Sequence, residues 1–164
     1  MFKPAVSVVE ALQDLFTCLG AIECGRAADL GLELSAELAN RRPDLTDVLL
    51  STAQAAREHS LELGEELTAA ICRGASARLG SRHPGASIEV RVPPFSAVQI
   101  GFGTGPRHTR GTPPNVVEMS PLVFIDLATG RWTWEDSAHH IRSSGAHAHE
   151  VQKAFPIWSG AAER

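Results

Sequence analysis

Three basic side chains on one Gly/Pro-rich segment are the first residues that could do chemistry. Arg107, His108 and Arg110 lie within the string GTGPRHTRGTPP, where glycine and proline predict a loop of fixed turns. Two guanidiniums and an imidazole can hold a carboxylate or phosphate through paired hydrogen bonds. We therefore expect this loop, with Asn115 and Glu118 just after it, to bind the polar head of a ligand. The alternative is that the arginines pair with acidic side chains of the chain and join its two halves.

Aromatic side chains gather late in the chain and could form the apolar part of the same site. They are Phe102, Phe124, Trp132, Trp134, Phe155 and Trp158. Aromatic rings often line ligand pockets, so we treat these six as pocket-lining candidates; ordinary core packing is the alternative. The chain has no Tyr, which removes one frequent general acid.

Metal and catalytic chemistry find little support in the residue spacing. His139, His140, His147 and His149 form pairs one and two apart, whereas zinc ligands on one helix face need spacings of three or four. Cys18, Cys24 and Cys72 are an odd number, and none of them forms a C-x-x-C pair, so we expect reduced thiols. There is no G-x-S-x-G motif, and the two G-x-G strings lack the third glycine of a dinucleotide site. We predict no catalytic residues, no metal and no cofactor, and we favour a protein that is not an enzyme.

The elements that must position these residues divide the chain into two parts. Residues 4–80 have the periodicity of α-helices, and Gly64 leaves open whether the last two are separate or one bent helix. The apolar stripes that show this are Val8, Leu12, Leu15, Phe16, Leu19; Leu30, Leu34, Leu38; Leu45, Val48, Leu49, Ala53, Ala56; and Leu63, Leu67, Ile71, Leu79.

The second part alternates strands with short helices. Apolar residues at 88, 90, 92 and at 98, 100, 102 predict two antiparallel strands, and residues 115–119 a third. Ser120-Pro121 predicts a helix start, residues 133–140 another short helix, residues 141–144 a last strand and residues 146–158 a final helix. The expected class is α+β, with an N-terminal helical region over 1–80 and an α/β domain over 81–160, or both as one compact unit.

Charge and hydropathy exclude some classes of partner. Residues 1–80 carry a net charge of −5 and residues 81–164 a net charge of +1, and neither part has the basic stripe of a nucleic-acid-binding protein. No apolar run approaches the roughly 20 residues of a membrane span. Glu10 and Asp14 interrupt the first apolar pattern, so it indicates an amphipathic helix and not a signal peptide. We therefore expect a cytoplasmic protein.

Several strings resemble a known family. Leu127-Ala128-Thr129-Gly130-Arg131, then a short helix, then IRSSG and a closing helix are similar to the C-terminal part of sterol carrier protein type 2 domains. The strings EVRVPPF and GPRHTRGTPPNVVE resemble the bacterial orthologue branch of that family, and the likeness covers about residues 75–158. The resemblance implies a small, mostly antiparallel sheet covered by helices, with an apolar tunnel between the layers. Eukaryotic relatives bind fatty acyl chains and sterols.

Three functions follow as expectations. The first is a carrier of a lipid-like or amphipathic small molecule. The second is a relative of bacterial thiol-dependent isomerases, in which a four-helix metal-binding domain precedes a sterol-carrier-like domain. Residues 1–80 contain a single histidine, His59, so a three-histidine metal triad cannot be built there. The third is a protein-interaction module or homodimer whose helices fill the tunnel.

Overall fold

A computed structural model describes residues 4–102, 115–158 and 160. The chain divides into two compact units, residues 1–71 and 72–164. The boundary falls inside one continuous helix, α4 (Gly64–Arg82), so that helix contributes to both units. The domain boundary expected near residue 80 stays a prediction. Among the described residues, no helix is both long and apolar enough to cross a membrane.

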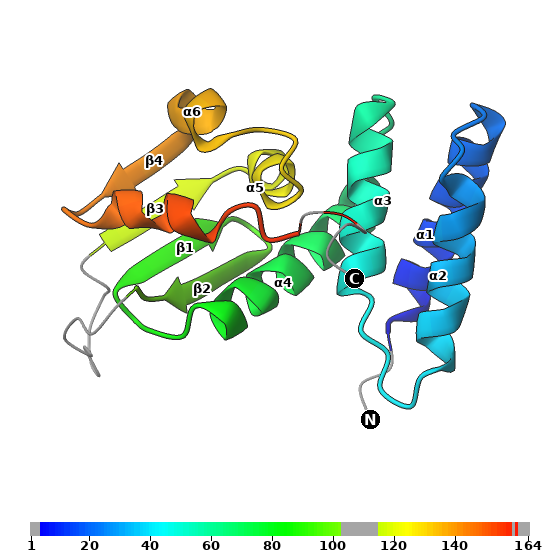
Figure 1. The fold of residues 1–164 in the computed structure, drawn as a ribbon, viewed down its shortest axis with the longest axis horizontal. Coiled ribbons are helices and arrows are strands. Elements are labelled where there is room, and N and C mark those ends of the chain that lie inside the picture. Colours follow the sequence, from blue (N-terminus) through cyan, green and yellow to red (C-terminus); the bar gives the residue numbers. More distant parts are fainter. Residues whose placement is uncertain (1–3, 103–114, 159, 161–164) are drawn as a thin grey trace. The chain divides into compact units, whose positions relative to one another are not determined.

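The first unit contains α1 (Val6–Ala21), α2 (Ala27–Ala39), α3 (Thr46–Glu58) and the start of α4 (Figure 1). Most residues of the predicted stripes are buried, because α1 packs against α2 and α3, and α2 packs against α3. The prediction was wrong for Leu38, which is 38% exposed near the end of α2. The buried residues of the first two helices are Val8, Leu12, Leu15, Leu19, Leu30 and Leu34. Arg26, at the turn between α1 and α2, donates to Gln54 Oε1 at 3.1 Å and to Ser51 Oγ, both on α3. The prediction of an N-terminal helical region is confirmed.

The third and fourth helices are separate. The chain turns between His59 and Leu63, where Ser60 has a φ of +57° and Gly64 a φ of +71°. Left-handed backbone of this kind suits glycine and cannot continue a right-handed helix. The sequence left open whether Gly64 separates two helices or bends one. The backbone at this turn shows that α3 and α4 are two separate helices.

The second unit is built on a four-stranded sheet with strand order β2-β1-β3-β4. The strands are β1 (Ile88–Val92), β2 (Ser96–Ile100), β3 (Asn115–Met119) and β4 (Ile141–Ser144). β1 is antiparallel to β2 and parallel to β3, and β3 is antiparallel to β4. Figure 1 shows the four strands side by side in this order. The expected antiparallel pair and the α+β class are confirmed.

The two faces of the sheet differ in polarity, as the alternation in β1 predicts. One face is buried and consists mainly of Ile88, Val90, Val92, Ile100, Val117 and Met119. The other is charged: Arg91 Nε donates to Glu89 Oε1 at 2.6 Å, and Arg142 lies 3.9 Å from Glu118. The hydrogen bond to Glu89, followed by the charge of that carboxylate, raises the pKa of Arg91.

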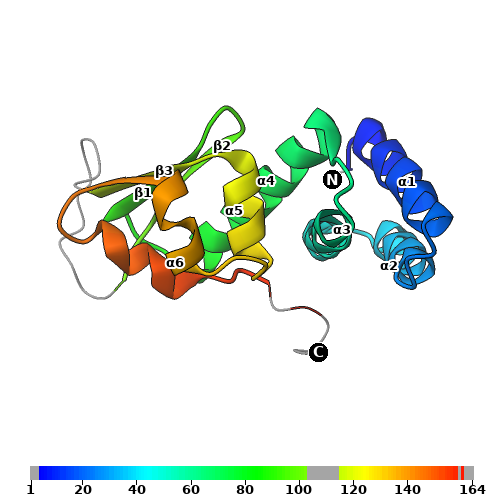
Figure 2. The same ribbon diagram turned by 90° about the horizontal axis from the view of Figure 1, so that it is seen from above.

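Short helices cover one side of the sheet. They are α5 (Pro121–Ala128), α6 (Trp134–Ser137), η1 (Ala138–His140) and η2 (Ala148–Ala154), and Figure 2 shows α5, α6 and η2 on the same side. The end of α4 also meets the sheet at β2. Ser76 Oγ lies 2.8 Å from Ser96 Oγ, and a Cβ on Gly80 would come within 2.8 Å of Val98.

Two predicted elements were wrong in extent. The strand expected through Phe102 ends at Ile100, because the Gly101 amide donates to His83 O and leaves the ladder. Gly101 also lies close to Gly85: a Cβ added to Gly85 would be only 2.6 Å from the Cα of Gly101. The helix expected over 146–158 is a 3₁₀ segment, Ala148–Ala154, followed by extended backbone at Phe155. Pro156 disfavours helical backbone at the residue before it, which explains the early end.

The burial of Cys72 makes a testable difference between the cysteines. Burial raises the pKa of the Cys72 thiol from 9.0 to about 12, with a smaller opposing effect of Arg73, whereas Cys18 is exposed. We expect an alkylating reagent to modify Cys18 and to spare Cys72 in the folded protein, as measured by peptide mass spectrometry. Denatured protein, in which all three cysteines react, is the control. Equal labelling of Cys18 and Cys72 at neutral pH would contradict the assignment.

The raised pKa of Cys72 also makes stability depend on pH. Because its pKa is higher in the folded protein, the Cys72 thiol stabilises the fold below about pH 9, and this contribution is lost as pH rises toward about 12.

Candidate functional site

Three of the predicted pocket-lining rings meet in one cluster, which we call the aromatic cluster: Phe124, Trp134 and Phe155. The Phe124 and Phe155 rings lie edge to face with centroids 6.0 Å apart, and Trp134 stacks on Phe155 at 6.2 Å. Phe124 is fully buried, whereas Trp134 and Phe155 are half-buried. The cluster therefore joins the buried core to the surface, and its outer two rings are partly open to solvent.

The other three aromatic candidates make different contacts. Trp158 is buried, and its amide donates to Ala128 O at 2.9 Å, which ties the end of the described chain to α5. The Trp132 ring lies 5.5 Å from His140. Phe102 lies 5.0 Å from His83, and Lys153 Nζ is 5.8 Å from its ring centroid.

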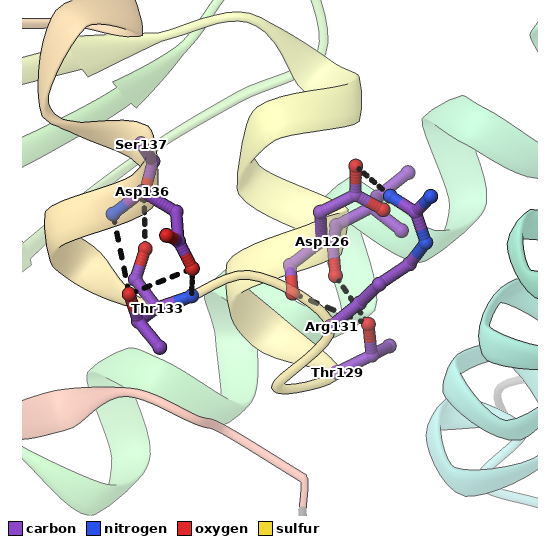
Figure 3. A network of polar contacts seen from close by, with 7 residues as sticks. Asp126, Thr129, Arg131, Thr133, Asp136 and Ser137 are labelled. Carbon is purple, nitrogen blue, oxygen red and sulfur yellow. Dashed lines mark hydrogen bonds and ion pairs between the residues drawn. The ribbon is translucent and has the colours of Figure 1, made fainter.

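A hydrogen-bonded turn joins α5 to α6, the short helix that carries Trp134, and its polar contacts involve Asp126, Thr129 and Arg131 (Figure 3). The carbonyl of Asp126 accepts from the amides of Arg131 and Trp132, at 2.8 and 3.1 Å. Its carboxylate accepts from Arg131 Nη1 at 3.1 Å and is only 1% exposed. Thr129 Oγ1 donates to Ile125 O, and Gly130 takes the left-handed φ of +69° that the turn requires. The L-A-T-G-R string is thus a structural turn, and Asp126 is the residue that sequence reasoning missed.

A capping box starts α6 directly after this turn. Thr133 Oγ1 accepts from the Asp136 amide at 3.2 Å, and Asp136 Oδ2 accepts from the Thr133 amide at 3.1 Å. The bond from the Thr133 backbone, followed by that from its hydroxyl, lowers the pKa of Asp136. The capping arrangement predicted from the sequence is confirmed, and it fixes the first turn of the helix that carries Trp134.

The two head-group candidates on β3 point to opposite faces of the sheet. Asn115 is buried, donates to Ser87 O and accepts from the His147 amide, both at 2.9 Å. Its amide therefore links the start of β1 to the start of η2. Glu118 lies on the charged face, opposite Arg142 of β4. Whether either residue contacts a ligand stays a prediction.

The remaining head-group candidates, Arg107, His108 and Arg110, lie outside the described residues. The register still shows where their segment begins and ends, because Ile100 and Asn115 both pair with Ile88. β2 thus ends, and β3 begins, at the same end of β1.

Charged groups from η2 lie at this end of the sheet. Glu150 Oε1 lies 3.6 Å from Lys153 Nζ and 4.0 Å from His147 Nδ1. Lys153 and His83 contact Phe102, the last described residue before the segment that carries the arginines. Glu150 and Lys153 gave no signal in the sequence, because only the fold brings η2 to the end of β2. Within residues 4–102, 115–158 and 160, no group of three or more His, Cys, Asp or Glu side chains could hold a metal ion.

Comparison with known proteins supplies the family. A family described as bacterial SCP ortholog matches residues 65–157, which is more than half of the chain. The chain belongs to this family. The bacterial SCP match begins at the start of α4 and includes the sheet, the turn at Asp126 and the aromatic cluster, whereas α1, α2 and α3 lie before it. No curated protein matches the chain.

The ion pair of Asp126 gives a stability prediction. Replacing Arg131 with Ala leaves a buried carboxylate with fewer partners, so we expect a loss of about 1–3 kcal/mol in the free energy of unfolding. Arg142→Ala is the matched control, because the Arg142 side chain is 90% exposed and should change stability by less than about 0.5 kcal/mol. Chemical denaturation measures both. Equal effects of the two substitutions would show that the Asp126 pair does not hold the turn.

The buried side-chain amide of Asn115 gives a second prediction about stability. Asn115→Ala leaves Ser87 O and the His147 amide without this partner, and we expect a destabilisation of about 1–3 kcal/mol. Gln99→Ala removes an exposed amide from β2 and should be nearly neutral. If Asn115→Ala instead keeps full thermal stability, the bridge between β1 and η2 contributes nothing to the fold.

Proposed function

We propose that this bacterial SCP protein is a non-enzymatic, cytoplasmic carrier of an amphipathic small molecule. The observation that carries the proposal is the aromatic cluster, which lies within the family domain and passes from the core to the surface. A ligand with an apolar chain gains about 25 cal/mol for each Å² of apolar surface that it buries. The two half-buried rings, Trp134 and Phe155, offer such surface.

The polar head of this ligand would bind at the end of β1. Segment 101–114 begins and ends there, and it carries Arg107, His108 and Arg110. Lys153 and His83 add a cation and an imidazole beside Phe102. This collection of donors favours an anionic head such as a carboxylate or phosphate. The arrangement requires open apolar space between the sheet and its helices, as in the tunnel expected from the family.

Native mass spectrometry of the purified protein, followed by organic extraction of the released material, tests the carrier function directly. We expect a bound amphiphile, such as a fatty acid or isoprenoid, with a mass above that of the bare chain. A bare mass from several expression hosts, together with no binding of added fatty acid, would contradict the proposal.

Substitutions separate the proposed head-group site from a structural role of the arginines. We expect Arg107→Ala and Arg110→Ala each to weaken binding of a fluorescent fatty acid about tenfold while the melting temperature stays within about 2 °C. Arg142→Ala, on the charged face of the sheet, is the control and should bind like the unaltered protein. A collapse of thermal stability in either loop variant, with binding unchanged at low temperature, would instead mean that the arginines hold the chain together.

A further inference from the structure

A cation and an apolar ring lie two residues apart on one segment of the second unit. Lys153 belongs to η2, its side chain is 57% exposed, and its Nζ lies 5.8 Å from the Phe102 ring centroid. Phe155 directly follows η2 and is the half-buried ring on which Trp134 stacks. Because two residues of chain span at most about 7 Å, little room remains for a long spacer between a head group at Lys153 and the aromatic cluster. The spacing favours a ligand whose charged head is attached directly to its apolar chain.

A carboxylate lies beside this cation. Glu150 Oε1 is 3.6 Å from Lys153 Nζ and 4.0 Å from His147 Nδ1. The Glu150 side chain is 26% exposed, so the protein encloses it more than it encloses Lys153. A lysine ammonium has three donors, and those that face the solvent can bind a head group while Glu150 stays close by. An anionic head group at Lys153 is therefore bound in the field of a neighbouring carboxylate.

The net charge of the Glu150–Lys153 pair determines which head groups bind well beside it. One carboxylate and one ammonium largely cancel, so the pair attracts an anion only weakly. This attraction grows in proportion to the charge of the head group, whereas the cost of removing the head group from water grows with the square of that charge. A carboxylate carries one negative charge, and an alkyl phosphate carries about 1.5 to 2 near pH 7. The pair therefore offsets the desolvation of a carboxylate better than that of a phosphate.

We propose that Lys153 binds the head group of the ligand and that Glu150 makes this position selective for a head group with a single negative charge. The inference rests on the proposed carrier function and narrows it, because the donors at the end of β1 favour an anion without choosing between a carboxylate and a phosphate. Glu150 determines specificity through its charge, and His147 is a second partner for its carboxylate when a head group engages Lys153.

Displacement of a fluorescent fatty acid from the full-length protein tests this selectivity. The competing probes are lauric acid, lauryl phosphate and lauryl alcohol, which share one apolar chain and differ in the charge of the head. Titrations near pH 7 compare the unaltered protein with Glu150→Gln and Lys153→Gln. Glu135→Gln is the matched control, because Glu135 is an exposed carboxylate on α6 and not on η2.

We expect the unaltered protein and Glu135→Gln to bind lauric acid at least about tenfold more tightly than lauryl phosphate. Glu150→Gln should strengthen binding of lauryl phosphate about tenfold and that of lauric acid less, because removal of one negative charge benefits the more highly charged head most. Lys153→Gln should weaken binding of lauric acid to the level of lauryl alcohol.

Two results would overturn this inference and leave the carrier function standing. They are binding of lauric acid and lauryl phosphate with equal affinity by the unaltered protein, and a preference for lauric acid that is the same in Glu150→Gln as in Glu135→Gln. Unchanged binding of lauric acid by Lys153→Gln would overturn the role of the cation in the same way. No displacement by any of the three probes, together with no binding of the fluorescent fatty acid, would overturn the carrier function and this inference with it.

Discussion

The position of β1 between β2 and β3 is the constraint on which the rest of the second unit depends. β1 pairs antiparallel with β2 and parallel with β3, so the chain must pass from β2 across the end of β1 to reach β3. Two strand spacings separate β2 from β3, about 10 Å. β2 ends and β3 begins at this end of β1, because Ile100 and Asn115 both pair with Ile88. The same end receives Asn115, whose amide joins the backbone before β1 to the start of η2.

The turn at Asp126 has a similar role on the helical layer. A buried carboxylate requires a partner, and Arg131 supplies it from five residues further along the chain. The carbonyl of the same residue accepts two amides, so backbone and side chain hold one conformation together. The capping box at Thr133 then starts α6 at once and places Trp134 against Phe155. Polar contacts at the turn between α5 and α6 therefore help to position the apolar cluster on which the proposed carrier function rests.

The two units differ in charge as well as in architecture. The first carries a net charge of −7, whereas residues 72–164 hold 7 acidic and 10 basic side chains, a net charge of +3. The family match covers the sheet-containing unit and begins where α4 begins. The basic unit is the one that would hold the anionic amphiphile of the proposed function. Electrostatic attraction of this kind mainly raises association rates and discriminates between partners.

The sequence by itself determined most of the local structure. Apolar spacings placed the helices of residues 4–80, alternation placed β1, and the Thr133–Asp136 pair marked the start of α6, because each depends on neighbours within a few residues. The strings around Leu127 and Glu118 indicated the family. Only the tertiary structure decided which aromatic rings meet, that Asn115 and Glu118 lie on opposite faces of β3, and that Glu150 and Lys153 come to the end of β2. It also ended the last helix at Ala154 and showed that Leu32 points outward. These features depend on strand order and on packing between segments far apart in the chain, which local patterns do not encode.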